Sequence, residues 1–285
     1  MNGKLLRDCS ILTLTALVSF ILMCSSSPAG AVQTTPDWNA IIHRVMAKVE
    51  ASRLQETVAH LESYGNRSTW ENQWDAARWS EQKLREYGLD VALQSYEFQG
   101  RQWPNVVARI NGRANNDASI LLIAHLDSIS DNPQTIAPGA DDDGSGLAVL
   151  IETARIIREA PPDITVIFCL FTNEERGAAG SKHFAGTAKR DKLKIHAVIN
   201  LDILGYNAPE HGSLSGAVQS HHTLKHKLKA VYRIVKNSVL FFLHGKDHVK
   251  IEGMKWDASL VNIVSSPFMQ YSGLGVKERI DDACD

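Results

Sequence analysis

Carboxylate and imidazole side chains follow three apolar runs in the middle of the chain, at the point where each run ends. Taken singly, such a histidine or acidic pair is usually structural or solvated. Together, acids gathered at one edge of a sheet would repel one another, and a bound cation would remove that repulsion. The side chains concerned are His125, Asp127, Glu174, Glu175 and Asp202.

An acidic, glycine-rich segment, residues 139–146, lies between the first two of these runs. Its Asp141-Asp142-Asp143 triplet precedes an apolar stretch with helical spacing, so by itself the segment is typical of a turn with a helix N-cap. Beside the other acids it also supplies a carboxylate to a shared cation. The combination predicts a metal site.

The residue types favour zinc. Imidazole nitrogen and carboxylate oxygen at about 2.0–2.2 Å suit Zn²⁺, whereas calcium and magnesium prefer shells of oxygen ligands. Two ions bridged by one carboxylate would use Asp142 as the bridge, and such a pair can polarise a peptide carbonyl and activate water. One member of the Glu174–Glu175 pair would bind metal while the other takes the proton of the water. Asp127 is placed to orient His125.

These side chains need a sheet that brings the three run ends together. Residues 119–124, 164–171 and 196–201 have the continuous apolar character of interior strands, and helical spacing over 147–159 and 180–189 places a helix after each of the first two. Strands that alternate with helices indicate an α/β fold around one sheet. Ligands of such sheets bind beyond the carboxyl ends of the strands.

The segment before this core has a different pattern. Helical spacing indicates helices within about residues 53–87, with Gly88 as a stop. Strand-like runs over 91–98 and 105–110 then predict a hairpin at the edge of the sheet. We expect residues 32–285 to form one domain.

Four segments, in order, resemble the bacterial secreted zinc aminopeptidases of metallopeptidase family 28, whose relatives include glutaminyl cyclase. The likeness extends over roughly residues 54–248. It implies a three-layer α/β sandwich with a single, mostly parallel mixed sheet of about eight strands and helices on both faces. The segments are His125-Leu126-Asp127-Ser128, Pro138 to Gly146, Phe171 to Glu175 with Gly180-Ser181, and Asn200-Leu201-Asp202.

The resemblance also implies a role for each site residue. Two zinc ions are expected, one held by His125 and Asp202, and both bridged by Asp142. The second zinc would be bound by Glu175, Glu174 would be the general base, and Asp127 would orient His125.

The C-terminal part departs from the family pattern. The family's second zinc takes a histidine from a Tyr-His-Thr-like motif, and no histidine follows His248 in this sequence. The part after residue 248 is short or divergent. His248 and, as an alternative, His244 are the candidates to replace that ligand. Three further histidines in a polar helical stretch are interpreted as surface residues: His221, His222 and His226.

The N-terminus has the pattern of a signal peptide over residues 1–31. A basic start, an apolar run over residues 11–24 and Ala29-Gly30-Ala31 predict cleavage and export to the periplasm or outside the cell, with an uncleaved anchor as the alternative. No stable membrane span is expected after cleavage. A net charge of −2 gives no reason to propose nucleic acid as a partner. Cys169 lies in an apolar run and is interpreted as a small buried hydrophobe, with a disulfide to Cys284 left open.

The leading functional hypothesis is a zinc aminopeptidase that acts on the N-termini of peptides or proteins. A single-zinc enzyme similar to glutaminyl cyclase is the first alternative, and a metal-binding protein with little or no turnover is the second. The related deacylases and carboxypeptidases are disfavoured because no inserted domain separates Glu175 from Asp202.

Overall fold

The structure is a computed structural model of the chain. It describes residues 44–45, 47–114, 118–133 and 136–204, and the backbone of three later strands at 239–243, 248–254 and 275–281. The expected signal peptide, Cys284 and the histidines at 221, 222, 226 and 244 lie outside the described residues.

The centre of the fold is a mixed sheet in the order β1-β2-β4-β3-β5-β6. The neighbours β3 and β4, β3 and β5, and β5 and β6 run parallel, while β1 pairs antiparallel with β2, and β2 with β4. The α/β class and the edge hairpin are therefore confirmed. The strands are β1 (Asp90–Phe98), β2 (Arg101–Ile110), β3 (Ala118–His125), β4 (Thr165–Phe171), β5 (Lys194–Leu201) and β6 (Val239–Leu243).

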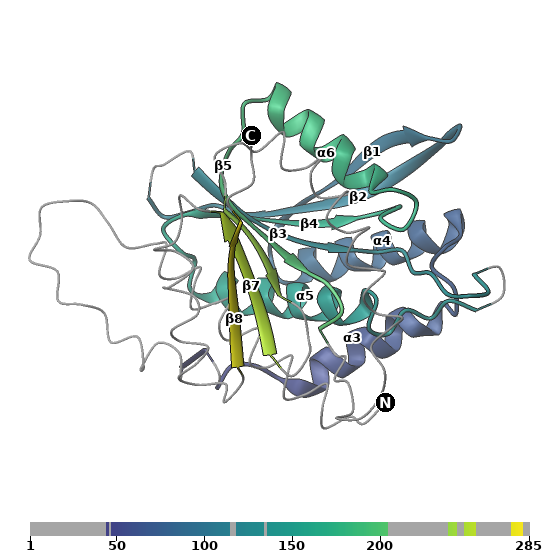
Figure 1. The fold of residues 1–285 in the computed structure, drawn as a ribbon, viewed down its shortest axis with the longest axis horizontal. Helices are drawn as coiled ribbons and strands as arrows, with labels where there is room; N and C mark the ends of the chain where they lie inside the picture. Colours follow the sequence, from purple (N-terminus) through teal and green to yellow (C-terminus); the bar gives the residue numbers. More distant parts are fainter. Residues whose placement is uncertain are drawn as a thin grey trace, which may run out of the picture.

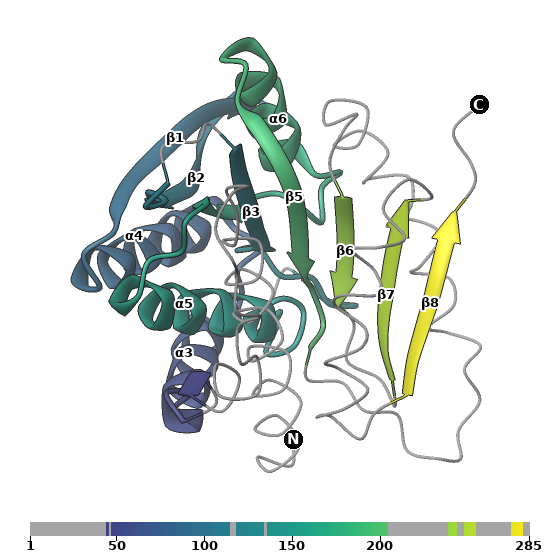
Figure 2. The same cartoon turned by 90° about the vertical axis from the view of Figure 1, so that its left-hand side faces the viewer.

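A second, two-stranded sheet follows along the chain. It consists of β7 (His248–Met254) and β8 (Gly275–Asp281), which are parallel. Figure 2 shows these strands beyond β6, on the side of the sheet away from β1. The described strands therefore fall into two sheets, and a single sheet of about eight strands in a three-layer sandwich stays a prediction.

Among the described helices, α3, α4 and α5 lie on one side of the main sheet and α6 lies on the other (Figure 1). The alternation of side chains along β3 explains this arrangement, because Ile120 and Leu122 join the core under α3, α4 and α5, whereas Leu121 and Ile123 join the smaller core under α6. Both faces of β3 are thus buried, as its apolar run predicted. The helices are α3 (Ala51–Ser63), α4 (Trp70–Glu86), α5 (Gly144–Glu159) and α6 (Ala179–Arg190).

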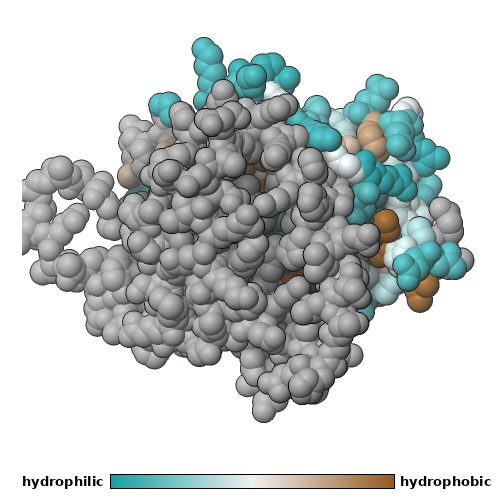
Figure 3. Space-filling model, in the orientation of Figure 1, coloured by the Kyte–Doolittle hydropathy of each residue, from teal (hydrophilic) through white to brown (hydrophobic). Residues whose placement is uncertain are grey.

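The surface of the described residues offers few apolar side chains. The large hydrophobic residues exposed there are Ile129 and Ile136, and the coloured part of the face in Figure 3 is mostly hydrophilic with small, separate hydrophobic spots. Within the described residues, no helix has the length and apolar character required to cross a membrane. Cys169 is a free, buried thiol in β4.

Candidate metal centre

The candidate site lies beyond the carboxyl ends of β3, β4 and β5. His125 is the last residue of β3, and the ladder to β4 continues one residue further through the backbone N–H of Leu126, which donates to Phe171 O at 2.7 Å. Glu174 and Glu175 follow β4 after two residues, and Asp202 directly follows β5. The parallel pairing of these strands brings their ends to one edge of the sheet.

His125 is buried, and both of its ring nitrogens face oxygen atoms. Nδ1 lies 3.0 Å from the main-chain oxygen of Asp127, and Nε2 lies 3.0 Å from Oδ1 of Asp142. Asp202 Oδ1 lies 4.0 Å from Nε2. A carbonyl oxygen can only accept, so Nδ1 carries a hydrogen and Nε2 is the nitrogen directed at the carboxylates.

Asp127 connects the end of β3 with the loop after β4. Its buried carboxylate accepts the backbone N–H groups of Glu174 at 2.9 Å and Glu175 at 3.0 Å. Its Oδ1 also lies 3.5 Å from Nδ1 of His125. The residue expected to orient His125 therefore also holds the backbone of both glutamates.

The three carboxylates of the acidic triplet have different hydrogen-bond partners. Asp143 is the N-cap of α5 and accepts from Gly146 N at 3.0 Å, while its other oxygen accepts the backbone N–H of His125 at 3.0 Å. Asp141 accepts from Ser145 Oγ at 2.8 Å. Asp142 is the member of the triplet whose carboxylate faces the His125 ring. The peptide bond between Asp142 and Asp143 is cis.

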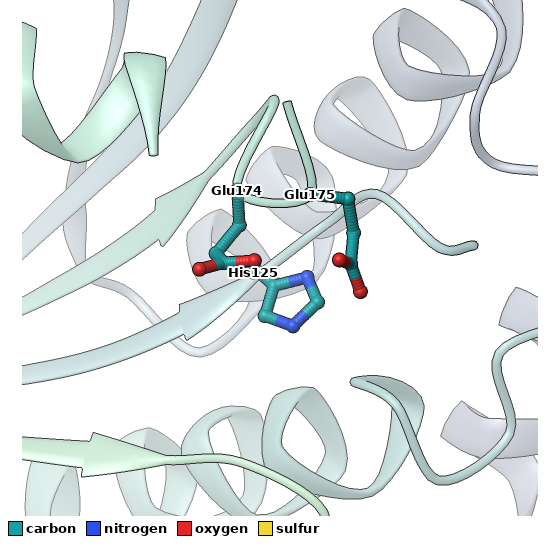
Figure 4. A group of neighbouring side chains, drawn as sticks. All are labelled: His125, Glu174 and Glu175. Atoms are coloured by element: carbon teal, nitrogen blue, oxygen red, sulfur yellow. The ribbon is translucent and has the colours of Figure 1, made fainter. Parts of the chain in front are cut away.

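Two overlapping groups of side chains are close enough to hold a cation. His125, Asp142 and Asp202 form one, and His125, Glu174 and Glu175 form the other; within each, one ligand atom per residue lies within 4.8 Å of the others. Figure 4 shows the two glutamates projecting from the loop after β4 on either side of the His125 ring. One buried imidazole with surrounding carboxylates is a donor set that fits zinc.

The electrostatics of the site also fit a cation. Burial raises the pKa of Asp202 to about 7 and that of Glu175 to about 8. Burial lowers the pKa of His125, but its hydrogen bonds to Asp127 and Asp142 outweigh this, so its pKa lies well above the usual value. Without a cation, the site therefore favours the protonated forms of these three groups more than water does. A bound metal ion would replace those protons and relieve the repulsion among the acids.

Several residues support the site although no sequence signal assigns them this role. Asn173, before the glutamate pair, has a left-handed backbone (φ 57°); its N–H donates to Gln73 Oε1 at 3.1 Å, and its side-chain amide donates to Tyr96 Oη at 2.9 Å. The Asp-Asp-Asp triplet alone does not indicate that Asp143 is the member that caps α5. Arg67 is buried beneath the loops of the site. Gln73 and Arg67 lie far from the motifs in sequence, where no spacing signal marks them.

The position of one predicted ligand, His248, is not tested by the described side chains. The backbone of His248 begins β7 in the two-stranded sheet, and its side chain lies outside the described residues. Its proposed contact with a second metal stays a prediction.

Comparison with known proteins identifies the family. The model of peptidase family M28 matches residues 105–259, more than half of the chain. The chain belongs to peptidase family M28. The matched segment contains the candidate ligands and the candidate base described above, from His125 to Asp202, and also His248.

Sequence relatives of this M28 chain are longer proteins. A protein of Pyrenophora teres f. teres described as a probable zinc metalloprotease is 31% identical over 197 residues, which cover 60% of this chain and 42% of that protein. A similarly described protein of Pyricularia oryzae is 30% identical over 211 residues, which cover 66% of this chain and 42% of that protein. The chain thus spans less than half the length of these relatives.

Solved structures share the fold of the M28 chain. The LapA aminopeptidase of Legionella pneumophila aligns with a TM-score of 0.51 and 23% identity over 68% of this chain and 59% of its own. A glutaminyl cyclase of Bacteroides thetaiotaomicron bound to N-acetylhistamine aligns with a TM-score of 0.51 and 15% identity over 67% of this chain and 83% of its own. At these identities the likeness concerns the fold alone, and this fold occurs both in a protein described as an aminopeptidase and in one described as a glutaminyl cyclase.

Proposed function

We propose that this chain is a zinc-dependent exopeptidase, an aminopeptidase that hydrolyses the N-terminal peptide bond of its substrate. The observation that carries the proposal is the sharing of His125 by two groups of potential ligands, one with Asp142 and Asp202 and the other with Glu174 and Glu175. His125 can bind one ion through Nε2, and a second ion beside it would depend on the carboxylates of Asp142 and Glu175. Membership of a peptidase family supports hydrolysis as the reaction.

Five residues would hold the two zinc ions. His125 and Asp202 would bind one zinc, Asp142 would bridge, and Glu175 would bind the second, with His248 as a further ligand. Zinc, when bound, polarises the substrate carbonyl and lowers the pKa of a water molecule in the site. The relatives described as probable zinc metalloproteases support the choice of metal.

The chain's own residues perform the proton transfers. The Glu174 carboxylate accepts a proton from the attacking water as its oxygen bonds to the carbonyl carbon, and it delivers that proton to the nitrogen of the leaving peptide as the C–N bond breaks. Asp127 keeps Glu174 in place by accepting its backbone N–H at 2.9 Å. The interaction of Asp127 with the His125 ring fixes which nitrogen faces the metal.

The location and the domain limits belong to the same proposal. A signal peptide over residues 1–31, followed by a zinc exopeptidase domain over residues 32–285, would deliver the enzyme to the periplasm or the exterior. Its substrates there would be the N-termini of peptides or proteins. A complete sheet of about eight strands between two helical layers is part of the proposed architecture.

Cyclisation of an N-terminal glutamine is the second candidate. The shared fold with a glutaminyl cyclase supports it as much as it supports the aminopeptidase. A single ion held by His125, Asp202 and one glutamate would be sufficient for such a reaction. The metal count therefore separates the candidates.

The test uses the purified mature chain. Zinc per chain is measured by atomic emission, and two reactions are followed: release of free amino acid from an aminoacyl chromogenic amide, and release of ammonia from a peptide with N-terminal glutamine. Two zinc ions with amino acid release support the proposal. One zinc with ammonia release assigns the cyclase reaction instead, zinc without turnover assigns a metal-binding protein, and absence of zinc overturns all three.

A further inference from the structure

We propose that Arg67 is a positioning residue for the metal centre, and that its buried guanidinium sets the separation between the segment that carries His125 and the turn that carries Asp142. This inference rests on the proposed zinc site. It concerns a residue outside the four motifs, in the connection between α3 and α4.

The guanidinium of Arg67 is completely buried and joins three parts of the chain. Nε donates to Leu126 O at 2.9 Å, and Leu126 is the residue between His125 and Asp127. Nη2 donates to Gly139 O at 2.9 Å, three residues before Asp142. Nη1 donates to Pro138 O and, at 3.1 Å, to Leu61 O in α3. One planar group thus spans both ligand-bearing segments and ties them to a helix.

The backbone of Arg67 makes a second connection between the same segments. Its N–H donates to Ser128 Oγ at 3.1 Å, and that hydroxyl donates to Ala137 O at 2.5 Å. The carbonyl of Gly139 also accepts from Gly144 N at 3.0 Å, at the first residue of α5. The turn with the acidic triplet is therefore fixed from both ends, by Arg67 on one side and by the helix on the other.

The charge of Arg67 is matched to the site. Burial lowers the pKa of this guanidinium, and the charges of Asp143, Asp127 and Asp142 oppose that effect. These three acids flank or form the candidate centre. The charges that compensate this buried cation lie in the metal site, whereas its hydrogen bonds go to main-chain carbonyls. Arg67 can therefore hold the backbone of the site without binding the metal ligands themselves.

Arginine is required for this geometry. Its guanidinium presents donors in a fixed plane, whereas the lysine ammonium is a point charge with three donors on a flexible stem. A lysine at residue 67 would keep the charge but could not reach Leu126, Gly139 and Leu61 with the same alignment. The positive charge would remain, but the separation between the His125 segment and the Asp142 turn would no longer be fixed.

The test compares Arg67→Lys with Arg155→Lys in the full mature chain. Arg155 is a matched control because it is also largely buried and makes several hydrogen bonds, to Glu152 and to Lys48 O, but in the last turns of α5. Zinc dissociation constants are measured by competition with a chromophoric chelator, and thermal unfolding is measured in EDTA. Because loss of a supporting partner weakens metal binding by about 10–100-fold, Arg67→Lys should raise the zinc dissociation constant at least about tenfold.

The control and a second variant keep the result decisive. Arg155→Lys should lower the unfolding temperature without changing zinc affinity, and an equal loss of affinity in both variants overturns the positioning role. If Arg67→Lys does not fold, Ser128→Ala removes the second connection alone and should also weaken zinc binding; unchanged affinity in that variant overturns the inference. Wild-type protein that binds no zinc would instead contradict the proposed function.

Discussion

The Asp127 carboxylate accepts the backbone N–H of Glu174 at 2.9 Å, so the end of β3 fixes the loop that follows β4. The other oxygen of the same carboxylate accepts from Glu175 N at 3.0 Å. Hydrogen bonds to both oxygens make this a bidentate contact between two strand ends. The relation links the candidate base, the candidate ligand beside it and the ring of His125 through one buried side chain.

Replacing Asp127 by asparagine should therefore loosen the glutamate pair. One oxygen can still accept, but the amide nitrogen that replaces the other cannot accept the second backbone N–H. We expect zinc affinity to fall about 10–100-fold with the fold retained. Chelator competition and circular dichroism measure the two. Asp131→Asn is the charge-matched control, because Asp131 is exposed in the loop that follows β3. This variant should leave zinc binding unchanged.

Glu174→Gln should separate turnover from metal binding. The amide keeps the shape of the side chain but cannot carry a proton, so we expect the rate to fall about 10²–10⁴-fold while zinc content stays at the wild-type value. Steady-state hydrolysis of an aminoacyl amide and metal analysis of the same sample provide the measurement. Loss of zinc in this variant would instead assign Glu174 as the ligand and Glu175 as the base.

Asp142→Asn tests the bridge. Asp142 is the carboxylate of the triplet that faces His125 Nε2, so its neutralisation should remove zinc from both positions. Asp141→Asn provides the comparison, because Asp141 bonds to Ser145 Oγ at the start of α5, and that variant should keep its zinc. Equal zinc content in Asp142→Asn and wild type would contradict the bridging role.

The sequence predicted the strands and candidate ligands of the site better than the residues that hold them in place. The run before His125 is buried on both faces in β3, which made its strand character readable from composition alone. The helix expected from residue 147 begins at Gly144, because Asp143 caps it and carries two glycines of low helical propensity into the first turn. Three adjacent aspartates give no local signal of which one caps the helix, and it is the resemblance to family 28 that implies a metal-bridging role for Asp142. Which aspartate caps the helix depends on the position of β3.

Arg67 and Asn173 illustrate a second limit. An arginine between Asn66 and Ser68 has the local pattern of a solvated turn, and only the packing of α3 against the loops buries it. Asn173 adopts a left-handed backbone that glycine would signal more clearly. Its partner Gln73 is 100 residues away along the chain. Long-range hydrogen bonds of this kind leave no periodicity for a sequence pattern to detect.

The metal-free protein should become less stable as pH rises from about 5 to about 8. Asp202 and Glu175 have folded-state pKa values raised by burial to about 7 and about 8, above the values of about 4 expected when unfolded. The folded state therefore binds more protons in this window, and its stability is lost as these groups ionise. The raised pKa of His125 acts in the same direction, because its stabilising charge is also lost with rising pH.

Thermal unfolding in EDTA measures this dependence. The decrease of the unfolding temperature with pH should be smaller in Asp202→Asn, because asparagine cannot ionise at that position. Zinc should reverse the trend, because it binds the deprotonated ligands, so the stabilisation by zinc should grow with pH. A metal-free unfolding temperature that rises through the window would contradict the raised pKa values.

Gly139→Ala should damage both stability and metal binding, because this glycine lies where the turn, Ser128 and Arg67 meet. Its φ of 54° costs an alanine about 1–2 kcal/mol. A Cβ there would also lie 2.4 Å from Asp142 O and 2.9 Å from Arg67 Nη2, and such overpacking adds about 1–3 kcal/mol. Gly100→Ala isolates the first contribution, since Gly100 has a φ of 71° and no atom within 4 Å of the position that a Cβ would occupy. Denaturant unfolding should show a larger loss of unfolding free energy for Gly139→Ala than for Gly100→Ala. Chelator competition should show weaker zinc binding in Gly139→Ala alone. Equal losses in the two variants would mean that the turn can move away from Arg67 without disturbing the site.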